Sequence, residues 1–364
     1  MKIVVDDNEF AALRRGWQEL ESSSGARPFQ RFDWAYAWYQ SIGRSTGRSL
    51  SIATLWDRER LTAVWPLVVH RYKGLRLLEW IGARATDYCD AIVAPDVDAQ
   101  TALGALWKVV RRQPFDIARF GQVRTDAKIY PFLQGRDPWT ETKEEAVGIP
   151  ITWRAGKEWL DAQPGRKEIR YRLRRLNKLG FEFHIWQPSE PLEPLIEAVL
   201  AQKRAWLSER GLGGFIGTEA GAQFLLATAR AFAEQGILHL SVMRSKNEIA
   251  AMHFGFLSDN VLYYYIPTYD ASLAKYGAGT ALFESLLMWA CDNDVRRMDL
   301  LIGAYGYKAR YGVTAEHLQT LVIPNTLRGR AGLALYRIAA LKKQLGAEQP
   351  AALDTAVAAP SEIS

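Results

Sequence analysis

Alternating apolar and polar positions predict β-strands in both halves of the chain. Residues 49–72 alternate on either side of the polar tetrapeptide 57–60, a pattern typical of two strands joined by a tight turn. Residues 238–266 alternate three times, interrupted by polar turns, which predicts a three-stranded antiparallel meander. Further short strands are expected at residues 75–82, 114–123, 181–186, 296–303 and 317–324.

Apolar residues spaced three and four apart predict the helices between these strands. Several of these segments end at a glycine, which accepts the left-handed backbone that terminates many helices. The expected helices cover residues 31–43, 97–112, 166–180, 193–211, 220–236, 280–294 and 328–345. The polar stretch 136–148 lacks either period, so we expect a connection between two domains there.

Two of the predicted hairpins align with each other without a gap. Ile52 falls on Leu240, Leu55 on Met243, Leu61 on Ile249 and Ala63 on Ala251. Antiparallel hairpins alternate in general, but here a helix and then a strand follow in both halves. The sequence therefore predicts two copies of one α/β (α+β) unit, each a mixed, mostly antiparallel sheet flanked by helices.

Composition fits a soluble protein with acidic partners. The 364 residues favour two domains, and 48% hydrophobic with 24% charged residues supports a packed core. A net charge of +6 suits phosphates, anionic polymers, lipid headgroups or nucleic acid. The 13 tryptophans fill cores, line clefts or face a membrane interface, and composition does not choose among these.

Several classes of protein are disfavoured. The two cysteines, Cys89 and Cys291, and five scattered histidines form neither a disulfide framework nor a metal-ligand spacing. The first ten residues lack the apolar core of a signal peptide, and no apolar run is long enough to span a bilayer. We expect a cytoplasmic protein, with peripheral contact to the inner membrane left open.

A glycine-containing loop leads from the meander into a predicted helix. The loop is Ala274-Lys275-Tyr276-Gly277-Ala278-Gly279-Thr280. A helix start offers unpaired N–H groups and a positive dipole end, which suit a pyrophosphate. An acyl-pantetheine arm can then pair its amides with a splayed strand edge nearby. Glycine pairs at a helix start are common, so the meander before and the strand after carry this prediction.

Residues 238–324 resemble the acyl-CoA-binding half of the GNAT superfamily. The matching pieces are NEIAAMHFGF, YYYIPTYD, YGAGTALFESLLMWA, DLLIG and YGYK, in that order. With FDWAYAWYQ, AVWPLVV, LRLLEWIG, TDYCDAIV and RYRLRRLNKLG, the resemblance extends over about residues 30–325 and is strongest to the cellulose-biosynthesis-associated (CelD/BcsL-like) acetyltransferases. It implies tandem GNAT-like domains: 1–145 without an evident cofactor site, 146–327 binding acyl-CoA, and 328–364 a basic helix with a disordered tail.

The resemblance also implies where the co-substrate binds. Acetyl-CoA or a longer acyl-CoA would lie on the loop that carries Lys275, Tyr276, Gly277, Ala278, Gly279 and Thr280. The superfamily usually places Arg or Gln three residues before the first glycine, but this chain has Ala274 there with Lys275 beside it. Fewer side-chain contacts to phosphate are therefore expected.

Acyl transfer to an amine needs a base, an oxyanion donor and an acid for the departing thiolate. The family's closing motif falls on Asp299, Gly303, Tyr307 and Lys308, with Tyr305 between. We predict Tyr307 as the acid, Lys308 as the holder of acceptor or oxyanion, and Asp299 as an orienting group. A structural Asp299–Lys308 ion pair is the alternative.

His253, in the middle strand of the meander, is a further candidate base. A hydrogen-bonded structural histidine is the commoner role at such a position.

Two predicted helices are strongly basic. Residues 166–180 contain seven Lys and Arg against one Glu, which indicates a solvated face or a contact for a phosphate or acidic acceptor. Nucleic acid is disfavoured because no recognised binding module accompanies the charge. Residues 328–345 either pack their leucines on a domain or lie on an anionic membrane surface.

These features favour an N-acyltransferase that acts on the amine of a small molecule or polymer precursor in exopolysaccharide, cellulose or envelope biosynthesis. A lipid-directed enzyme of the ceramide type and a Fem-like aminoacyl transferase remain alternatives, the latter disfavoured because no inserted coiled-coil arm is evident. A non-catalytic GNAT-like scaffold is the alternative of another class.

Overall fold

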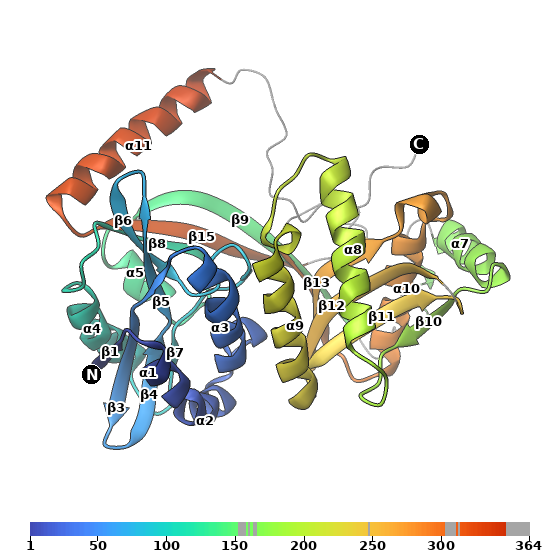
Figure 1. Ribbon diagram of the computed structural model, residues 1–364, viewed down its shortest axis with the longest axis horizontal. Helices are drawn as coiled ribbons and strands as arrows, with labels where there is room; N and C mark the ends of the chain where they lie inside the picture. The colour runs from blue at the N-terminus through green and yellow to red at the C-terminus, as the bar shows by residue number, and fades with distance from the viewer. Residues whose placement is uncertain are drawn as a thin grey trace. The chain divides into compact units, whose positions relative to one another are not determined.

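The computed structural model in Figure 1 describes residues 1–151, 158, 161–162, 166–246, 248–302, 311 and 314–346. The chain divides into two compact units. Among the described residues, unit 1 holds Met1–Glu144 and His317–Gly346, and unit 2 holds Glu145–Glu316. Each unit has a mostly antiparallel sheet flanked by helices, so the predicted fold class is confirmed.

Unit 1 contains a small sheet and a larger one. Its elements are β1 (Lys2–Val4), α1 (Asp7–Ala12), α2 (Arg14–Ser24), η1 (Pro28–Gln30), α3 (Phe32–Trp38), η2 (Tyr39–Gly43), β2 (Ser49–Leu50), β3 (Ile52–Asp57), β4 (Arg60–Trp65), β5 (Leu67–Tyr72), β6 (Leu75–Trp80), β7 (Ile92–Val93), α4 (Ala99–Val110), β8 (Ile117–Arg124), α5 (Tyr130–Gln134) and α11 (Leu327–Gly346), with parts of β9 (Trp139–Pro150) and β15 (Thr314–Pro324). The small sheet has the order β1-β3-β4-β7, and the larger one runs β9-β15-β8-β6-β5-β2.

Tryptophans build much of the core of unit 1. Trp65 is fully buried and stacks on Trp107, with ring centroids 5.7 Å apart, and Phe120 and Phe132 complete the cluster. A second group, Trp17, Trp34 and Trp38, is also fully buried. In unit 1 most of the tryptophans therefore serve packing rather than an interface.

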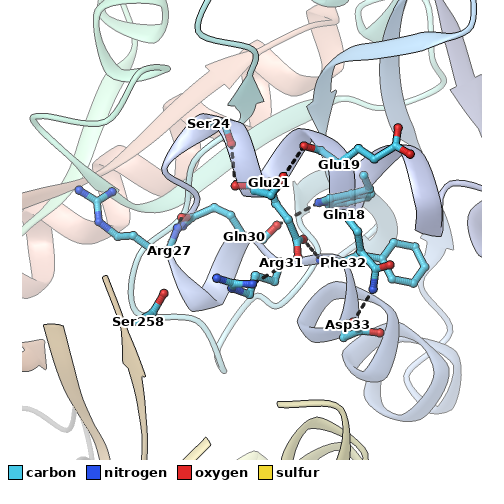
Figure 2. A network of polar contacts seen from close by, with 12 residues as sticks. Gln18, Glu19, Glu21, Ser24, Arg27, Gln30, Arg31, Phe32, Asp33 and Ser258 are labelled. Atoms are coloured by element: carbon cyan, nitrogen blue, oxygen red, sulfur yellow. Dashed lines mark hydrogen bonds and ion pairs between the residues drawn. The ribbon is translucent and has the colours of Figure 1, made fainter. Parts of the chain in front are cut away.

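A buried polar network joins α2 to the start of α3 in unit 1 (Figure 2). One Glu21 carboxylate oxygen accepts the Phe32 N–H at 2.8 Å, and the other lies 3.5 Å from the Arg31 guanidinium. Desolvation raises the pKa of Glu21 to about 7, against the opposing effects of these partners. Both carboxylate oxygens are engaged, so Glu21 acts as a cap for the first turn of α3.

Unit 2 holds the meander predicted from the sequence. Its elements are the second part of β9, α7 (Arg166–Lys178), β10 (Glu182–Ile185), α8 (Glu193–Glu209), η3 (Phe215–Gly217), α9 (Glu219–Glu234), β11 (Leu238–Arg244), β12 (Ile249–Ser258), β13 (Val261–Tyr269), η4 (Ala271–Tyr276), α10 (Ala278–Asp292) and β14 (Arg297–Ile302). The strand order is β10-β11-β12-β13-β14-β9, antiparallel except between β13 and β14.

The predicted hairpin repeat is present in the register of the strands. Leu55 pairs with Ala63 in unit 1, and Met243 pairs with Ala251 in unit 2, the positions that the sequence alignment matched. Each hairpin also has its irregularity directly after this pair. The two hairpins share both their register and the position of their bulge. This supports duplication more strongly than a shared alternation of apolar and polar residues does.

Two segments differ from the sequence prediction. Residues 136–148, expected as a connection, mostly form β9, a strand that passes from unit 1 into unit 2. This strand forms, despite its charged residues, because it pairs with strands that are distant in the sequence, and local periodicity does not reveal such pairing. Residues 317–327, expected in the second domain, include the part of β15 that pairs with β8 in unit 1.

Candidate functional site

Strands β13 and β14 pair with each other over only part of their length. The parallel register links Val261 to Arg297, Leu262 to Met298 and Tyr263 to Asp299, whereas β13 runs on to Tyr269. On its other side β13 carries an irregularity opposite Gly255 of β12. A Cβ at Gly255 would lie 2.2 Å from the Tyr263 carbonyl oxygen, so this close approach requires glycine. The meander thus ends in a bulged strand beside a diverging neighbour.

A second bulge lies on β14 where the ladder with β13 ends. The register of β14 with β9 shifts between Asp299 and Ile302, and Leu301 adopts a positive φ of 59°. The Asp299 Oδ1 accepts the Leu301 N–H at 2.9 Å, and its Oδ2 lies 3.8 Å from the Arg297 Nε. Strained backbone of this kind persists where surrounding contacts hold it, often at functional sites. Asp299, predicted as an orienting group, is buried and holds the bend of β14.

The predicted glycine loop lies at the start of α10. Gly277 has a φ of 65°, a left-handed conformation that favours glycine, and it precedes the first helical residue, Ala278. Gly277 has no side chain with which to cap this helix start, whereas Asp270 caps the preceding η4 turn through the Ser272 N–H. The first amides of α10 therefore have no partner within the helix.

Basic helix α7 brings cations to this loop. A Cβ at Gly277 would lie 2.7 Å from the Nη1 of Arg172, so the guanidinium packs directly against the glycine backbone. Arg172 also binds Glu168 at 2.9 Å, and Arg175 lies 4.9 Å from the ring centre of Tyr276. Lys275 lies 5.1 Å from the same ring. Arg172, Arg175 and Lys275 thus bring positive charge to a loop that has Ala274 where the superfamily usually has Arg or Gln.

The sequence did not single out Arg172. Its signal is the basic run 166–180, which indicates either a solvated helix face or a contact for a phosphate or acidic acceptor. The structure divides that run, because Ile169 and Leu176 are buried while Arg174 and Lys178 are exposed. Residues three or four apart share a helix face, so Arg172 lies on the side of Ile169 and Leu176. Arg175 is exposed and reaches the Tyr276 ring of η4.

Gly279, by contrast, is not crowded. A Cβ there would meet the Tyr269 side chain at an ordinary 3.6 Å. Ala278 is buried, and Thr280 is partly buried in the first turn of α10. Among the predicted loop residues, Gly277 is therefore the one whose backbone requires glycine.

His253 lies in the core of unit 2. Its ring is fully buried and stacks on Tyr264 with centroids 4.4 Å apart, and its Nδ1 is 3.5 Å from the Ser241 Oγ. Desolvation lowers the pKa of His253 well below its usual value, and it lowers that of the nearby His239 to about 4. His253 is thus a neutral aromatic residue at neutral pH, and its role as a base stays a prediction.

Two further buried charges lie in unit 2. Glu284 of α10 is paired with Arg166 and accepts the Tyr311 hydroxyl, and burial raises its pKa. Lys203 of α8 lies 4.6 Å from the Trp206 ring, and desolvation lowers its pKa to about 8. The residues Gly303, Tyr305, Tyr307 and Lys308 lie outside the described residues, so their predicted roles are not tested.

The site falls within a segment that matches a known family. Residues 164–309 match the family model described as Acetyltransferase (GNAT) domain. This segment is therefore similar to a GNAT domain. It includes α7, the meander, η4, α10 and β14, and so contains every element of the site described above. No curated protein sequence is a significant match to the chain.

Solved structures show the same fold over most of the chain. The C-terminal domain (DUF2156) of a candidate lysylphosphatidylglycerol synthetase from Agrobacterium fabrum has a TM-score of 0.58 at 12% identity, covering 91% of this chain and 97% of its own. FemX has a TM-score of 0.57 at 10% identity, covering 88% and 97%. A tandem GNAT protein from the clavulanic acid pathway has a TM-score of 0.51 at 10% identity, covering 89% and 98%. These likenesses extend the tandem GNAT fold to unit 1.

The described residues offer neither a metal site nor a membrane-spanning helix. They contain no group of three or more His, Cys, Asp or Glu placed to hold a metal ion. Within the same part of the chain, no helix has the length and hydropathy needed to cross a bilayer.

Proposed function

We propose that the protein is an acyl-CoA-dependent N-acyltransferase and that unit 2 binds the co-substrate. The observation that carries this proposal is the start of α10, where Gly277, a residue without a capping side chain, lies against Arg172. Helix amides and a guanidinium together suit a pyrophosphate, and GNAT domains in general use acyl-CoA.

The bend between β13 and β14 supports a place for the pantetheine arm. A ladder that ends at Tyr263 leaves the rest of β13 beside the glycine loop that follows Asp270. The arm's amides can then pair with a strand edge in the manner of an added strand. This arrangement would bring the thioester toward the bulges of β13 and β14.

The reaction follows from that placement. The nitrogen of a neutral amine attacks the thioester carbonyl, a C–N bond forms, and the C–S bond breaks. The amine loses one proton and the coenzyme A thiolate gains one, so no metal or redox group is needed. We propose Tyr307 as the acid for the thiolate and Lys308 as the holder of the oxyanion or acceptor.

Asp299 would act on the site through the backbone. Its hydrogen bond to Leu301 supports a positioning role, because it fixes the bend from which the Tyr307 segment follows. His253 would become the next candidate base if Tyr307 and Lys308 proved dispensable.

For the acceptor we propose an amine of a sugar or polymer precursor in exopolysaccharide, cellulose or envelope biosynthesis. The resemblance of residues 30–325 to the cellulose-associated acetyltransferases supports it. A lipid base of the ceramide type is the related alternative, and the basic surface of the chain, with its net charge of +6, suits either acidic context.

A second candidate function is aminoacyl transfer. It is favoured by the two solved structures with the higher TM-scores among those named above, a candidate lysylphosphatidylglycerol synthetase and FemX. At 10–12% identity these likenesses show the fold, so the donor must be tested directly.

The decisive experiment incubates the protein with candidate amines and either a mixture of acyl-CoAs or aminoacyl-tRNA, and follows the products by mass spectrometry. Tyr307→Phe and Lys308→Ala should each lower kcat by about 100- to 10,000-fold, with a smaller effect on CoA affinity. Folded variants that keep wild-type turnover would contradict these roles. Binding of CoA without any turnover would indicate a scaffold, and turnover only with aminoacyl-tRNA would establish the second candidate.

A further inference from the structure

Helix α11 packs on unit 1 through its smallest residues. A Cβ at Gly329 would lie 2.0 Å from the Asp116 carbonyl oxygen, and one at Gly332 would lie 2.6 Å from Leu75 Cδ1. Leu333 is buried against Ile117 and Val322 on the same side. Glycine costs helix stability, so these two positions serve close approach to β6 and β8 rather than helix formation.

Three other large apolar side chains of α11 point away from the rest of unit 1. Leu327, Leu335 and Ile338 are 80%, 69% and 51% exposed. At 100° per residue they share one face with the exposed Ala331 and Ala334. An ordinary surface helix has the opposite arrangement, with its apolar face inward.

Cations border this outer face. Arg328, Arg330 and Arg337 are exposed, and α11 contains no acidic residue. The Arg328 guanidinium donates to the Gly74 carbonyl, which brings the β5–β6 turn, with exposed Tyr72 and Lys73, beside the first turn of α11. In Figure 1 this helix lies along one side of unit 1, next to β6.

We propose that the outer face of α11 docks on an anionic membrane surface. An interfacial helix inserts an apolar face while Lys and Arg at its borders bind acidic headgroups, and this face offers both. A symmetric dimer through the same face would bring two rows of arginines together, which disfavours a second copy as the occupant. The proposal does not depend on the acyl donor or on the catalytic residues.

The test is sedimentation of the full chain with phosphatidylcholine vesicles, with and without phosphatidylglycerol. The wild type should sediment with the vesicles that contain phosphatidylglycerol. Leu335→Ser combined with Ile338→Ser should weaken this binding by about tenfold or more, because two exposed apolar side chains are lost. Arg330→Gln combined with Arg337→Gln should remove the preference for the anionic lipid.

Leu179→Ser is the matched control, because Leu179 is 49% exposed and lies in unit 2. It should bind vesicles like the wild type, and all variants should keep the wild-type Tm because the replaced side chains are exposed. The proposal is overturned if the wild type binds neither vesicle, or if the L335S/I338S variant binds as the wild type does. A dimer in sedimentation velocity that this variant abolishes, without vesicle binding, would instead identify a self-association face.

Discussion

Helices α4 and α10 occupy matching places in the two units but begin differently. Each follows a strand and leads into a parallel neighbour, β6 to β8 in unit 1 and β13 to β14 in unit 2, with three registered pairs in both cases. Helix α4 starts at Asp98, whose carboxylate accepts the Thr101 N–H at 2.9 Å. Helix α10 starts at Gly277, with Arg172 across it. The first helix start already holds a carboxylate, whereas the N-cap residue of the second supplies no capping side chain.

The bends in the parallel strands differ in the same way. Both β8 and β14 carry a bulge with one left-handed residue, Gln122 at a φ of 57° and Leu301 at 59°. In unit 1 the segment of Cys89 lies beside the bulge of β8. The Cys89 N–H donates to the Gln122 carbonyl, and Cys89 forms a bridge with Val123. The two units thus share a frame, while in unit 1 the Asp98 cap and the segment of Cys89 occupy these two places. This contrast is consistent with a cofactor site in unit 2 alone.

The strongest test of the contrast is Gly277→Val. The branched side chain would meet Arg172 in a backbone conformation that suits glycine, so both phosphate contacts should be disturbed. We expect CoA affinity, measured by calorimetry, to fall roughly a hundredfold, from two lost charge-assisted contacts.

The control for this variant is Gly180→Val, because Gly180 has a φ of 83° and open space around it. It should lose a similar stability of about 1–2 kcal/mol and keep CoA affinity. Equal affinity losses in the two variants would show that strain, rather than the phosphate site, is responsible.

Acid should destabilise unit 2 through its histidines. By register His253 matches Trp65 of unit 1, and its folded pKa, like that of His239, lies below the unfolded value of 6.5. Between pH 6.5 and about 4 the unfolded state therefore binds more protons, so stability falls as pH falls. Each histidine contributes up to about 1.4 kcal/mol per pH unit.

Urea unfolding at several pH values measures this effect, and His253→Phe should flatten the dependence. His317→Gln, a change at an exposed histidine, should leave it unaltered. An unchanged slope in H253F would contradict the assignment.

Arg172→Gln should have a smaller effect than the glycine variant. Loss of one charged phosphate contact should weaken CoA binding about tenfold and reduce its salt dependence. Arg174→Gln, on an exposed position of the same helix, should change neither quantity beyond a small screening effect. If R172Q and R174Q behave alike, the helix acts as a diffuse charge and not as a contact.

The smallest expected effect belongs to Asp98→Ala. Loss of this cap should lower the Tm by a few degrees at neutral pH, while CoA affinity and turnover stay unchanged. Hydrogen bonds from Thr101 lower the Asp98 pKa, so the cap stabilises above the unfolded pKa and is lost as pH falls through the folded one. A change in CoA affinity would mean that unit 1 also takes part in binding.

The sequence predicted what local patterns determine. The two hairpins, the meander and the glycine before α10 follow from alternation and helix-start chemistry within a few residues. The approach of Arg172 to Gly277 was not predictable in that way, because it depends on how α7 packs on α10. Strand β9 was not predictable from local patterns either, because its charged sequence is typical of a linker and its strand partners are distant in the sequence. The positive φ of Leu301 has no local signal in an apolar strand.

The course of β15 bears on how the chain is made. Synthesis from the N-terminus completes residues 1–144 early, yet β8 gains its neighbour β15 only after Glu316 has emerged. Unit 2, a contiguous stretch, can fold before unit 1 is finished. During that interval β8 presents an unpaired edge, the kind of surface that recruits other strands and favours aggregation. Unit 2 can therefore complete its fold before unit 1 does, and we expect chains that terminate before β15 to accumulate as insoluble material.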